Sequence, residues 1–148
     1  MPSTYTSLHC HIVFSTKDRH AWIDELWIER LHAYMGGVLK GLRCQPHIIG
    51  GVADHVHILV GFPATITISD LVRDLKKAAT GWIRDEMGKH EFSWQVGYAA
   101  FSVSANDMDD VRCYIANQAE HHRKVSFLDE LVSLLEAAGV EYDPRYLD

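Results

Sequence analysis

Apolar residues recur along the chain with two periods, which together predict four strands and four helices. Alternating apolar and polar residues over 5–15 and 54–60 are typical of β-strands. Apolar spacing of three and four residues over 22–41 and 68–87 is typical of amphipathic helices. The predicted order is strand 5–15, helix 22–41, strand 43–52, strand 54–60, helix 68–87, strand 97–104, helix 107–122 and a final helix that opens at Ser126 and stops at Gly139.

This order predicts an α+β protein with the ferredoxin-like split βαβ fold: β-α-β-β-α-β with an antiparallel sheet, followed by two C-terminal helices. In that fold strands 5–15 and 54–60 lie at the centre of the sheet, and Pro46 suits an edge strand. Helices 22–41 and 68–87 are expected to cover one face of the sheet and to leave the other face open. No linker interrupts the pattern, so residues 1–148 are expected to form one domain.

Composition places the chain among ordinary globular proteins. It is 47% hydrophobic and 23% charged. No apolar run approaches the roughly 20 residues of a membrane span, and residues 1–5 do not resemble the start of a signal peptide. Three cysteines, Cys10, Cys44 and Cys113, have no paired spacing and suit a reducing compartment. We therefore expect a cytoplasmic protein that does not enter a membrane.

The formal net charge of −6 argues against a protein that coats long stretches of duplex DNA, because that surface must be basic. Small basic clusters nevertheless recur, and they are either solvated surface or contacts to the phosphates of a nucleic acid. The residues selected as candidate DNA-phosphate contacts are Lys17, Arg19, Lys76, Arg123 and Lys124. Exposed aromatic residues would be able to stack on unpaired bases.

Two pairs of histidines stand on the predicted central strands. His55 and His57 point to the same face of one strand, ~6.5–7 Å apart along the backbone. His9 and His11 form a similar pair on the neighbouring strand. Two imidazoles side by side on a rigid element are suited to bind a metal ion, although two polar residues on a solvated sheet face explain so short a pattern more simply. The pattern alone does not choose between the two pairs.

A polar stripe also runs along the predicted helix 107–122. Tyr114, Gln118 and His121 recur at i, i+4 and i+7, at the edge of a stripe that packs through Val111, Ile115 and His122. A phenol and an amide one helical turn apart are able to reach a single site. The alternative is a half-buried aromatic residue beside a surface amide, as on many amphipathic helices.

Together these segments resemble the single-tyrosine HUH transposases of the smallest bacterial insertion sequences, including the IS200-like and the REP-associated tyrosine transposases. The matching segments are His11-Ile12-Val13-Phe14-Ser15-Thr16-Lys17, Asp54-His55-Val56-His57, Trp94 to Ser104 with Gly97-Tyr98 and Phe101-Ser102-Val103-Ser104, and Tyr114 to Phe127 with Asn117-Gln118 and Glu120-His121-His122-Arg123-Lys124. The resemblance spans nearly the whole chain. The order of the HUH triplet and a tyrosine helix that carries Gln four residues on is its most specific feature.

The resemblance implies a role for each candidate residue. By similarity, His55, His57 and Gln118 hold a divalent metal, Mg²⁺ or Mn²⁺, and Tyr114 is the nucleophile. His9, His11 and His121 would then lie in the shell behind the metal ligands or contact DNA.

The resemblance likewise implies a DNA transposase that cuts and rejoins single-stranded DNA through a 5′-phosphotyrosine, with hairpin ends of a mobile element as substrate. It implies a homodimer in which the tyrosine helix is able to complete the partner's site, and the leucine-rich last helix needs a surface to pack on. Two alternatives remain on the residues alone: a ferredoxin-like module that binds single-stranded nucleic acid without cutting it, and a metal-dependent phosphodiesterase that uses water.

Overall fold

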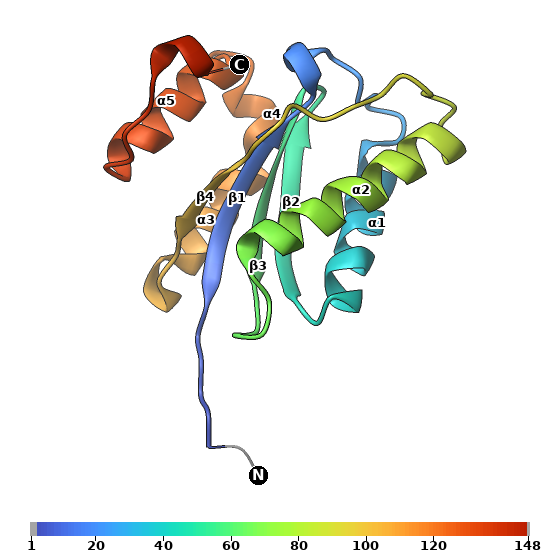
Figure 1. Ribbon diagram of the computed structural model, residues 1–148. Coiled ribbons are helices and arrows are strands. Elements are labelled where there is room, and N and C mark those ends of the chain that lie inside the picture. Colours follow the sequence, from blue (N-terminus) through green and yellow to red (C-terminus); the bar gives the residue numbers. More distant parts are fainter. Residues whose placement is uncertain (1–2, 148) are drawn as a thin grey trace.

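The computed structural model describes residues 3–147 and contains a four-stranded sheet between two helical layers (Figure 1). The strands are β1 (His9–Ser15), β2 (Gln45–Val52), β3 (His55–Gly61) and β4 (Ala99–Ser102). The helices are α1 (Ile28–Gly41), α2 (Ile68–Glu86), α3 (Met108–Ala116), α4 (Gln118–His121) and α5 (Phe127–Ala137), with short 3₁₀ turns at Lys17–Arg19, Ala105–Asp107 and Pro144–Tyr146.

The sheet order is β2-β3-β1-β4, and every neighbouring pair is antiparallel. This order confirms the predicted split βαβ fold, with β1 and β3 at the centre and β2, which contains Pro46, at an edge. In the register, His57 lies opposite Val13 of β1 and Gly50 of β2. Backbone hydrogen bonds on both sides of β3 therefore fix the position of His57 relative to β1 and β2.

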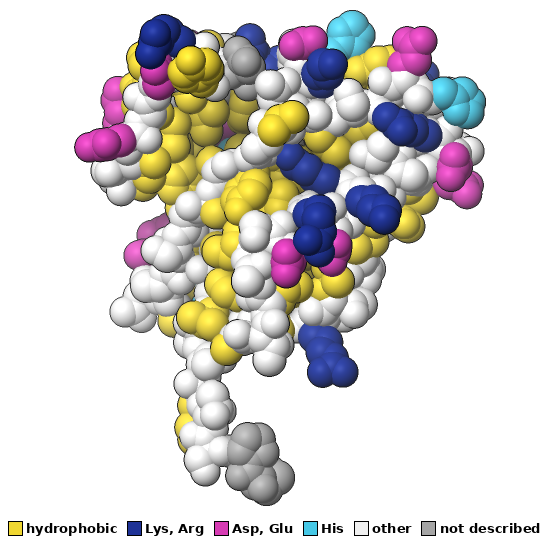
Figure 2. Space-filling model, viewed as in Figure 1, with side chains coloured by type: hydrophobic (Ala, Val, Ile, Leu, Met, Phe, Trp, Pro, Cys, Tyr) yellow, Lys and Arg dark blue, Asp and Glu magenta, His cyan; other side chains and the backbone are white. Residues whose placement is uncertain are grey.

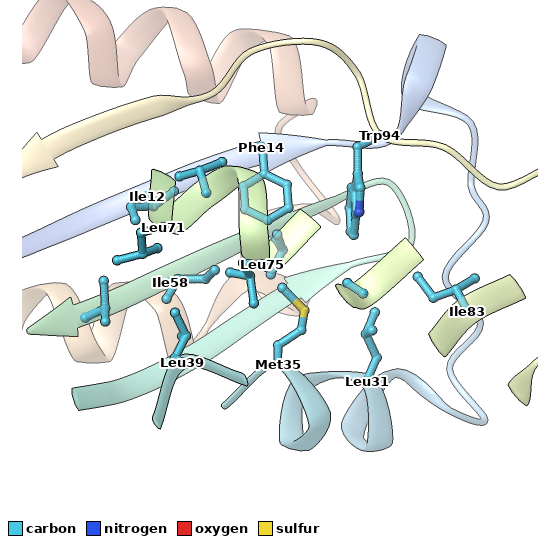
Figure 3. Packing of buried hydrophobic residues seen from close by; sticks show 14 of the residues in the cluster. Ile12, Phe14, Leu31, Met35, Leu39, Ile58, Leu71, Leu75, Ile83 and Trp94 are labelled. Atoms are coloured by element: carbon cyan, nitrogen blue, oxygen red, sulfur yellow. The ribbon is translucent and has the colours of Figure 1, made fainter. Parts of the chain in front are cut away.

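One face of the sheet packs on α1 and α2 and forms the main apolar core (Figure 3). Ile12 and Phe14 of β1 and Ile58 of β3 point into it, together with Leu75 of α2 and Met35 of α1. All five are at most 2% exposed. Burial of each large apolar side chain contributes roughly 1.5–3 kcal/mol, so this face supplies most of the stability of the fold.

The opposite face was expected to be open, and this prediction is wrong. In the structure α3, α4 and the start of α5 cover it, and His55 and His57 are completely buried (Figure 1). A small second cluster, in which Leu59 and Ile115 are buried, packs α3 onto this face. The two helices that follow the ferredoxin-like core therefore close the face that the core alone leaves exposed.

Helix boundaries differ from the predicted ones where a side chain competes for the backbone. The first helix begins at Ile28 and not at 22, because the carboxylate of Asp24 accepts the N–H of Leu26 in a turn and Trp27 has non-helical dihedrals. The helix expected over 107–122 breaks at Asn117. The last helix starts where predicted, since Ser126 caps it by accepting a hydrogen bond from the N–H three residues on, and Thr67 caps α2 in the same way.

Two strands are shorter than the sequence predicts. β1 begins at His9 and not at residue 5, and β4 is limited to Ala99–Ser102 because Gly97 has a φ of 93°. Within residues 3–147 no helix is long and apolar enough to cross a bilayer. Figure 2 shows Lys and Arg side chains gathered over α2, among Asp and Glu, and apolar side chains in a hollow below α5.

Candidate active site

Strand β3 directs two imidazoles into the layer between the sheet and α3–α5. His55 and His57 are both fully buried, and their ring centroids are 5.1 Å apart. The side chains of Val56 and Ile58 point to the opposite face and pack in the main core. Strand alternation therefore places both histidines of the HUH triplet on one face of the sheet, as the sequence predicts.

A hydrogen bond orients His55. Its Nδ1 donates to the carboxylate of Asp54 over 2.7 Å, which leaves Nε2 directed at the interior of the site. Burial alone would lower the pKa of His55, but hydrogen bonds to Asp54 and Glu130 outweigh burial and raise it to about 8. His55 therefore carries positive charge more readily than His57 or His11, whose pKa values burial lowers.

His57 is oriented by His11, one of the two residues of the second histidine pair. His57 Nδ1 and His11 Nε2 are 2.8 Å apart, and the two rings stack with centroids at 5.0 Å. Burial, followed by the neighbouring His57, lowers the pKa of His11 to about 3, so this imidazole is neutral. Burial also lowers the pKa of His57. His11 therefore lies behind His57, one of the two positions that the resemblance left open for it.

Helices α3 and α4 bring a phenol and an amide to the same point. Tyr114 is half-buried on α3, with its ring edge toward His57 at a centroid distance of 5.8 Å. The break at Asn117 starts a new turn, α4, in which Gln118 is 1% exposed and its Oε1 lies 3.2 Å from Nε2 of His55. The four residues selected from the sequence thus meet, although the connecting helix is not continuous.

At the centre of the site lies Glu130 of α5, which the sequence interpretation did not include. Its carboxylate is 2% exposed and accepts hydrogen bonds from the hydroxyl of Tyr114 and from Nε2 of Gln118, the latter over 3.0 Å. A signal for it exists in the sequence: the residue stands three positions after Phe127 and four before Leu134, within the apolar stripe of the last helix. A carboxylate within an apolar stripe needs polar partners.

The charge of Glu130 also governs the phenol. Burial alone would raise the pKa of Glu130, but hydrogen bonds from His55 and His57 lower it well below its usual range, so the carboxylate is ionised. Burial, followed by the Glu130 carboxylate, raises the pKa of Tyr114 well above its usual value. In this arrangement the phenol keeps its proton and donates a hydrogen bond to the carboxylate.

The donor set fits a divalent metal ion. His55, His57, His122 and Glu130 each offer one ligand atom, and these atoms all lie within 4.8 Å of one another. His122, expected to pack against the helix stripe, instead turns its Nε2 to within 2.9 Å of Glu130. Imidazole nitrogens combined with carboxylate and amide oxygens suit Mn²⁺, Zn²⁺ or Mg²⁺, in keeping with a metal-binding role.

The remaining two histidines selected from the sequence differ in their distance from this centre. Nε2 of His121 is 3.3 Å from a carboxylate oxygen of Glu130, at the rim of the site and without a hydrogen bond. His9 lies two residues before His11, at the start of β1, and faces His47, with ring centroids 5.3 Å apart. The structure therefore brings His11 and His121, but not His9, to the candidate site.

The five candidate DNA contacts are also divided. Arg19 and Arg123 line one groove of about 520 Å³ that reaches Asp54 and His122 beside the site. Lys17 borders a different recess, and Lys124 is exposed. On the opposite face of the sheet, the ammonium of Lys76 donates to the backbone carbonyls of residues 95 and 97 over 2.9 and 2.5 Å, and so fixes that loop.

Leu131 and Leu135, on the leucine-rich face of α5, line a cavity of about 250 Å³ together with Val13 of β1 and the loop 95–99. Tyr114, His55 and His57 of a single chain are already together.

Comparison with known proteins places this geometry in a family. The family model described as "Transposase IS200 like" matches residues 4–118. No curated protein matches the sequence. Among solved structures, a candidate transposase from Deinococcus radiodurans R1 is 21% identical with a TM-score of 0.66, covering 80% of this chain and 95% of its own. A REP-associated tyrosine transposase bound to a REP hairpin is 16% identical with a TM-score of 0.62, covering 84% of this chain and 74% of its own.

These two structures share the fold, and the family match spans most of the chain, from β1 to the start of α4. It includes the HUH triplet on β3 as well as Tyr114 and Gln118. The chain belongs to the IS200-like transposase family and is a transposase with the HUH arrangement of a tyrosine enzyme.

Proposed function

We propose that this transposase cuts and rejoins single-stranded DNA, with Tyr114 as the nucleophile and a 5′-phosphotyrosine as the intermediate. The observation that carries the proposal is the convergence of Tyr114, His55, His57 and Gln118 on one buried point, from three different elements. Buried polar groups cost stability unless they are paired, so a cluster of this kind is expected where chemistry needs it.

In this proposal His55, His57 and Gln118 hold a divalent metal ion, Mg²⁺ or Mn²⁺. When bound, the ion would polarise the scissile phosphate and offset the negative charge that develops during attack. The chain contributes the orientation of the ligands. Asp54 and His11 hold the two imidazoles so that Nε2 of His55 faces Gln118 and Nε2 of His57 faces Glu130.

The covalent step is an exchange of one phosphate ester for another. The oxygen of Tyr114 forms a bond to phosphorus, its proton passes to solvent, and the bond from phosphorus to the 3′ oxygen breaks. The departing 3′ oxygen takes up a proton and becomes a hydroxyl. Attack by another 3′-hydroxyl on the phosphotyrosine reverses the step, so strand joining needs no ATP.

The substrate class is inferred from the family and from the surface near the site. The similar structure with a REP hairpin supports hairpin-forming single-stranded DNA as the substrate. The groove lined by Arg19 and Arg123 is a candidate path for the strand, because guanidinium groups bind phosphate oxygens. A homodimer and a cytoplasmic location belong to the same proposal, and the free state of all three cysteines supports the latter.

The decisive experiment is denaturing electrophoresis of the protein with a labelled single-stranded hairpin DNA and Mn²⁺. The proposal predicts a covalent protein–DNA adduct that disappears completely in Tyr114→Phe, while hairpin binding persists in a mobility-shift assay. Tyr5→Phe, at a tyrosine that is 92% exposed, is the matched control and should retain the adduct.

Each rival function gives a different gel. Free 5′-phosphate ends without an adduct would indicate a phosphodiesterase that uses water. Binding without cleavage would indicate a nucleic-acid-binding module. An adduct that survives Tyr114→Phe would overturn the assignment of the nucleophile.

A further inference from the structure

The two oxygens of the Glu130 carboxylate face different partners. Oε1 lies 2.9 Å from Nε2 of His57, 2.9 Å from Nε2 of His122 and 3.4 Å from Nε2 of His55. Oε2 accepts the hydroxyl of Tyr114. One oxygen is therefore surrounded by imidazole nitrogens, and the other holds the phenol.

For two of these imidazoles the position of one proton is fixed by the partner of Nδ1. His122 Nδ1 lies 2.7 Å from the carbonyl oxygen of Val125, and His55 Nδ1 lies 2.7 Å from the carboxylate of Asp54. Both partners are acceptors, so both Nδ1 atoms carry a proton. In the neutral ring, Nε2 then presents a lone pair toward Glu130.

Lone pairs that face a carboxylate repel it, so the geometry calls for positive charge, which either a protonated ring or a bound cation supplies. Protonating several adjacent rings would place like charges together in a buried space, whereas one divalent cation supplies the charge at a single point. Imidazoles whose Nδ1 donates to a carboxylate or to a backbone carbonyl, and whose Nε2 atoms point toward one shared centre, are arranged as metal ligands are.

We propose that His122 and Glu130 are metal ligands alongside His55 and His57, so that α5 supplies the carboxylate of the metal centre. This inference rests on the proposed function, which assigns a divalent metal to the site, and it extends the ligand set beyond Gln118. Oε1 of Glu130 is the ligand atom, and Oε2 positions Tyr114 beside the metal. A single carboxylate thereby links the metal centre to the nucleophile.

The local structure of α5 explains how the carboxylate is delivered. Ser126 caps the helix by accepting the N–H of Asp129, and Phe127 is buried with its ring centroid 4.4 Å from that of His55. Glu130 follows Phe127 by three residues and therefore lies on the same side of the helix. The cap and the Phe127 contact together fix the first turn of α5 over β3.

The donor set also implies a metal preference. Three imidazoles and one carboxylate suit Mn²⁺ better than Mg²⁺, because Mg²⁺ prefers an all-oxygen environment. Isothermal titration of the full chain with Mn²⁺ and with Mg²⁺ measures this directly. We expect Mn²⁺ to bind at least about tenfold more tightly, and Mg²⁺ binding as tight as Mn²⁺ would contradict the imidazole-rich set.

The ligand assignment is tested by Mn²⁺ titration of Glu130→Gln and of His122→Gln. We expect each variant to bind Mn²⁺ at least 10- to 100-fold more weakly than the wild type, since even outer-shell substitutions cost that much. Asp129→Asn is the matched control: it removes the same charge from the same helical turn, but its side chain is exposed and outside the site. Its affinity should equal that of the wild type.

A second measurement guards against a variant that folds poorly. Saturating Mn²⁺ should raise the thermal unfolding temperature of the wild type and of Asp129→Asn, but raise that of Glu130→Gln and His122→Gln much less. Unchanged Mn²⁺ affinity in Glu130→Gln and His122→Gln, with loss of affinity in His57→Ala, would refute this inference alone. Unchanged affinity in His57→Ala as well would instead refute the metal site of the proposed function.

Discussion

The two faces of the sheet are equally buried but are built in opposite ways. On the α1–α2 face, Ile12, Phe14 and Ile58 pack against apolar side chains. On the face that α3, α4 and α5 cover, His57 and Glu130 are buried against each other and against polar groups. Apolar burial stabilises a fold without further conditions, whereas polar burial is tolerated only where every donor meets an acceptor. The first face therefore holds the fold together, and in the proposed function the second face carries the chemistry.

The largest expected effect separates two adjacent residues of β3 that point to opposite faces. Ile58→Ala should lower the free energy of unfolding by about 2–5 kcal/mol through lost burial and a cavity, while the folded protein still forms the DNA adduct. His57→Ala should reduce adduct formation at least about 100-fold. Its free energy of unfolding should fall much less, because burying an imidazole itself costs desolvation energy.

Urea unfolding and the adduct assay, run on both variants below the unfolding transition, measure the two effects separately. Comparable losses of stability and of activity in the two variants would contradict the assignment of stability to the apolar face and of adduct formation to the polar face.

The sequence predicts the apolar face of the sheet better than the polar face. Alternation along β1 and β3 identifies Ile12, Phe14 and Ile58 as core, because apolar burial depends only on the period of the pattern. The roles of His122 and Glu130 depend on a helix break at Asn117 and on the approach of α5, neither of which the period contains. The continuous helix predicted over 107–122 placed His122 on a packing stripe. The sequence pattern did not show which polar groups would meet Glu130.

The HUH pair and Tyr114 were nevertheless selected as candidates from the sequence, and the structure brings them together. Strand alternation alone puts His55 and His57 on one face, and a single helical turn joins Tyr114 to the position of Gln118. Choosing this histidine pair over His9 and His11 required the resemblance to a family, because both pairs have the same spacing. The structure adds a physical difference: His11 lies behind His57, while His9 faces His47.

An intermediate effect is expected where α3 approaches the sheet at Gly50 of β2. A Cβ added there would lie 2.6 Å from the carbonyl oxygen of Ile115 and 2.9 Å from its Cγ2. Gly50→Ala should therefore push α3 away from the sheet, at a cost of about 1–3 kcal/mol in unfolding free energy. Because Tyr114 precedes Ile115, adduct formation should also fall, by about tenfold or more.

The matched control for Gly50→Ala is a glycine in the helical layer on the other face of the sheet. Gly37, within α1, has no atom within 4 Å of its added Cβ. Gly37→Ala should raise the unfolding free energy by about 0.5–1 kcal/mol, as expected for a helix interior, and leave the adduct unchanged. Equal behaviour of the two alanine variants would mean that the contact between β2 and α3 does not position the tyrosine.

The smallest expected effect concerns pH and the α1 side of the molecule. His32 of α1 is largely buried, its Nε2 has no hydrogen-bond partner, and burial lowers its pKa from 6.5 to about 4. Between pH 6.5 and 4 the unfolded chain therefore binds a proton that the folded chain does not. The corresponding stability is fully present above pH 6.5 and is lost as the pH falls toward 4.

After allowance for the partial exposure of this side chain, the loss is of order 1–2 kcal/mol. His32→Gln, which does not titrate, should show a flatter decline of unfolding free energy between pH 6.5 and 4 in urea titrations. Burial lowers the pKa of His11 in the same direction, so part of the acid sensitivity should remain in this variant and should come from the site face. An identical pH profile in wild type and His32→Gln would assign the whole acid response to the polar face, and so sharpen the contrast between the two layers.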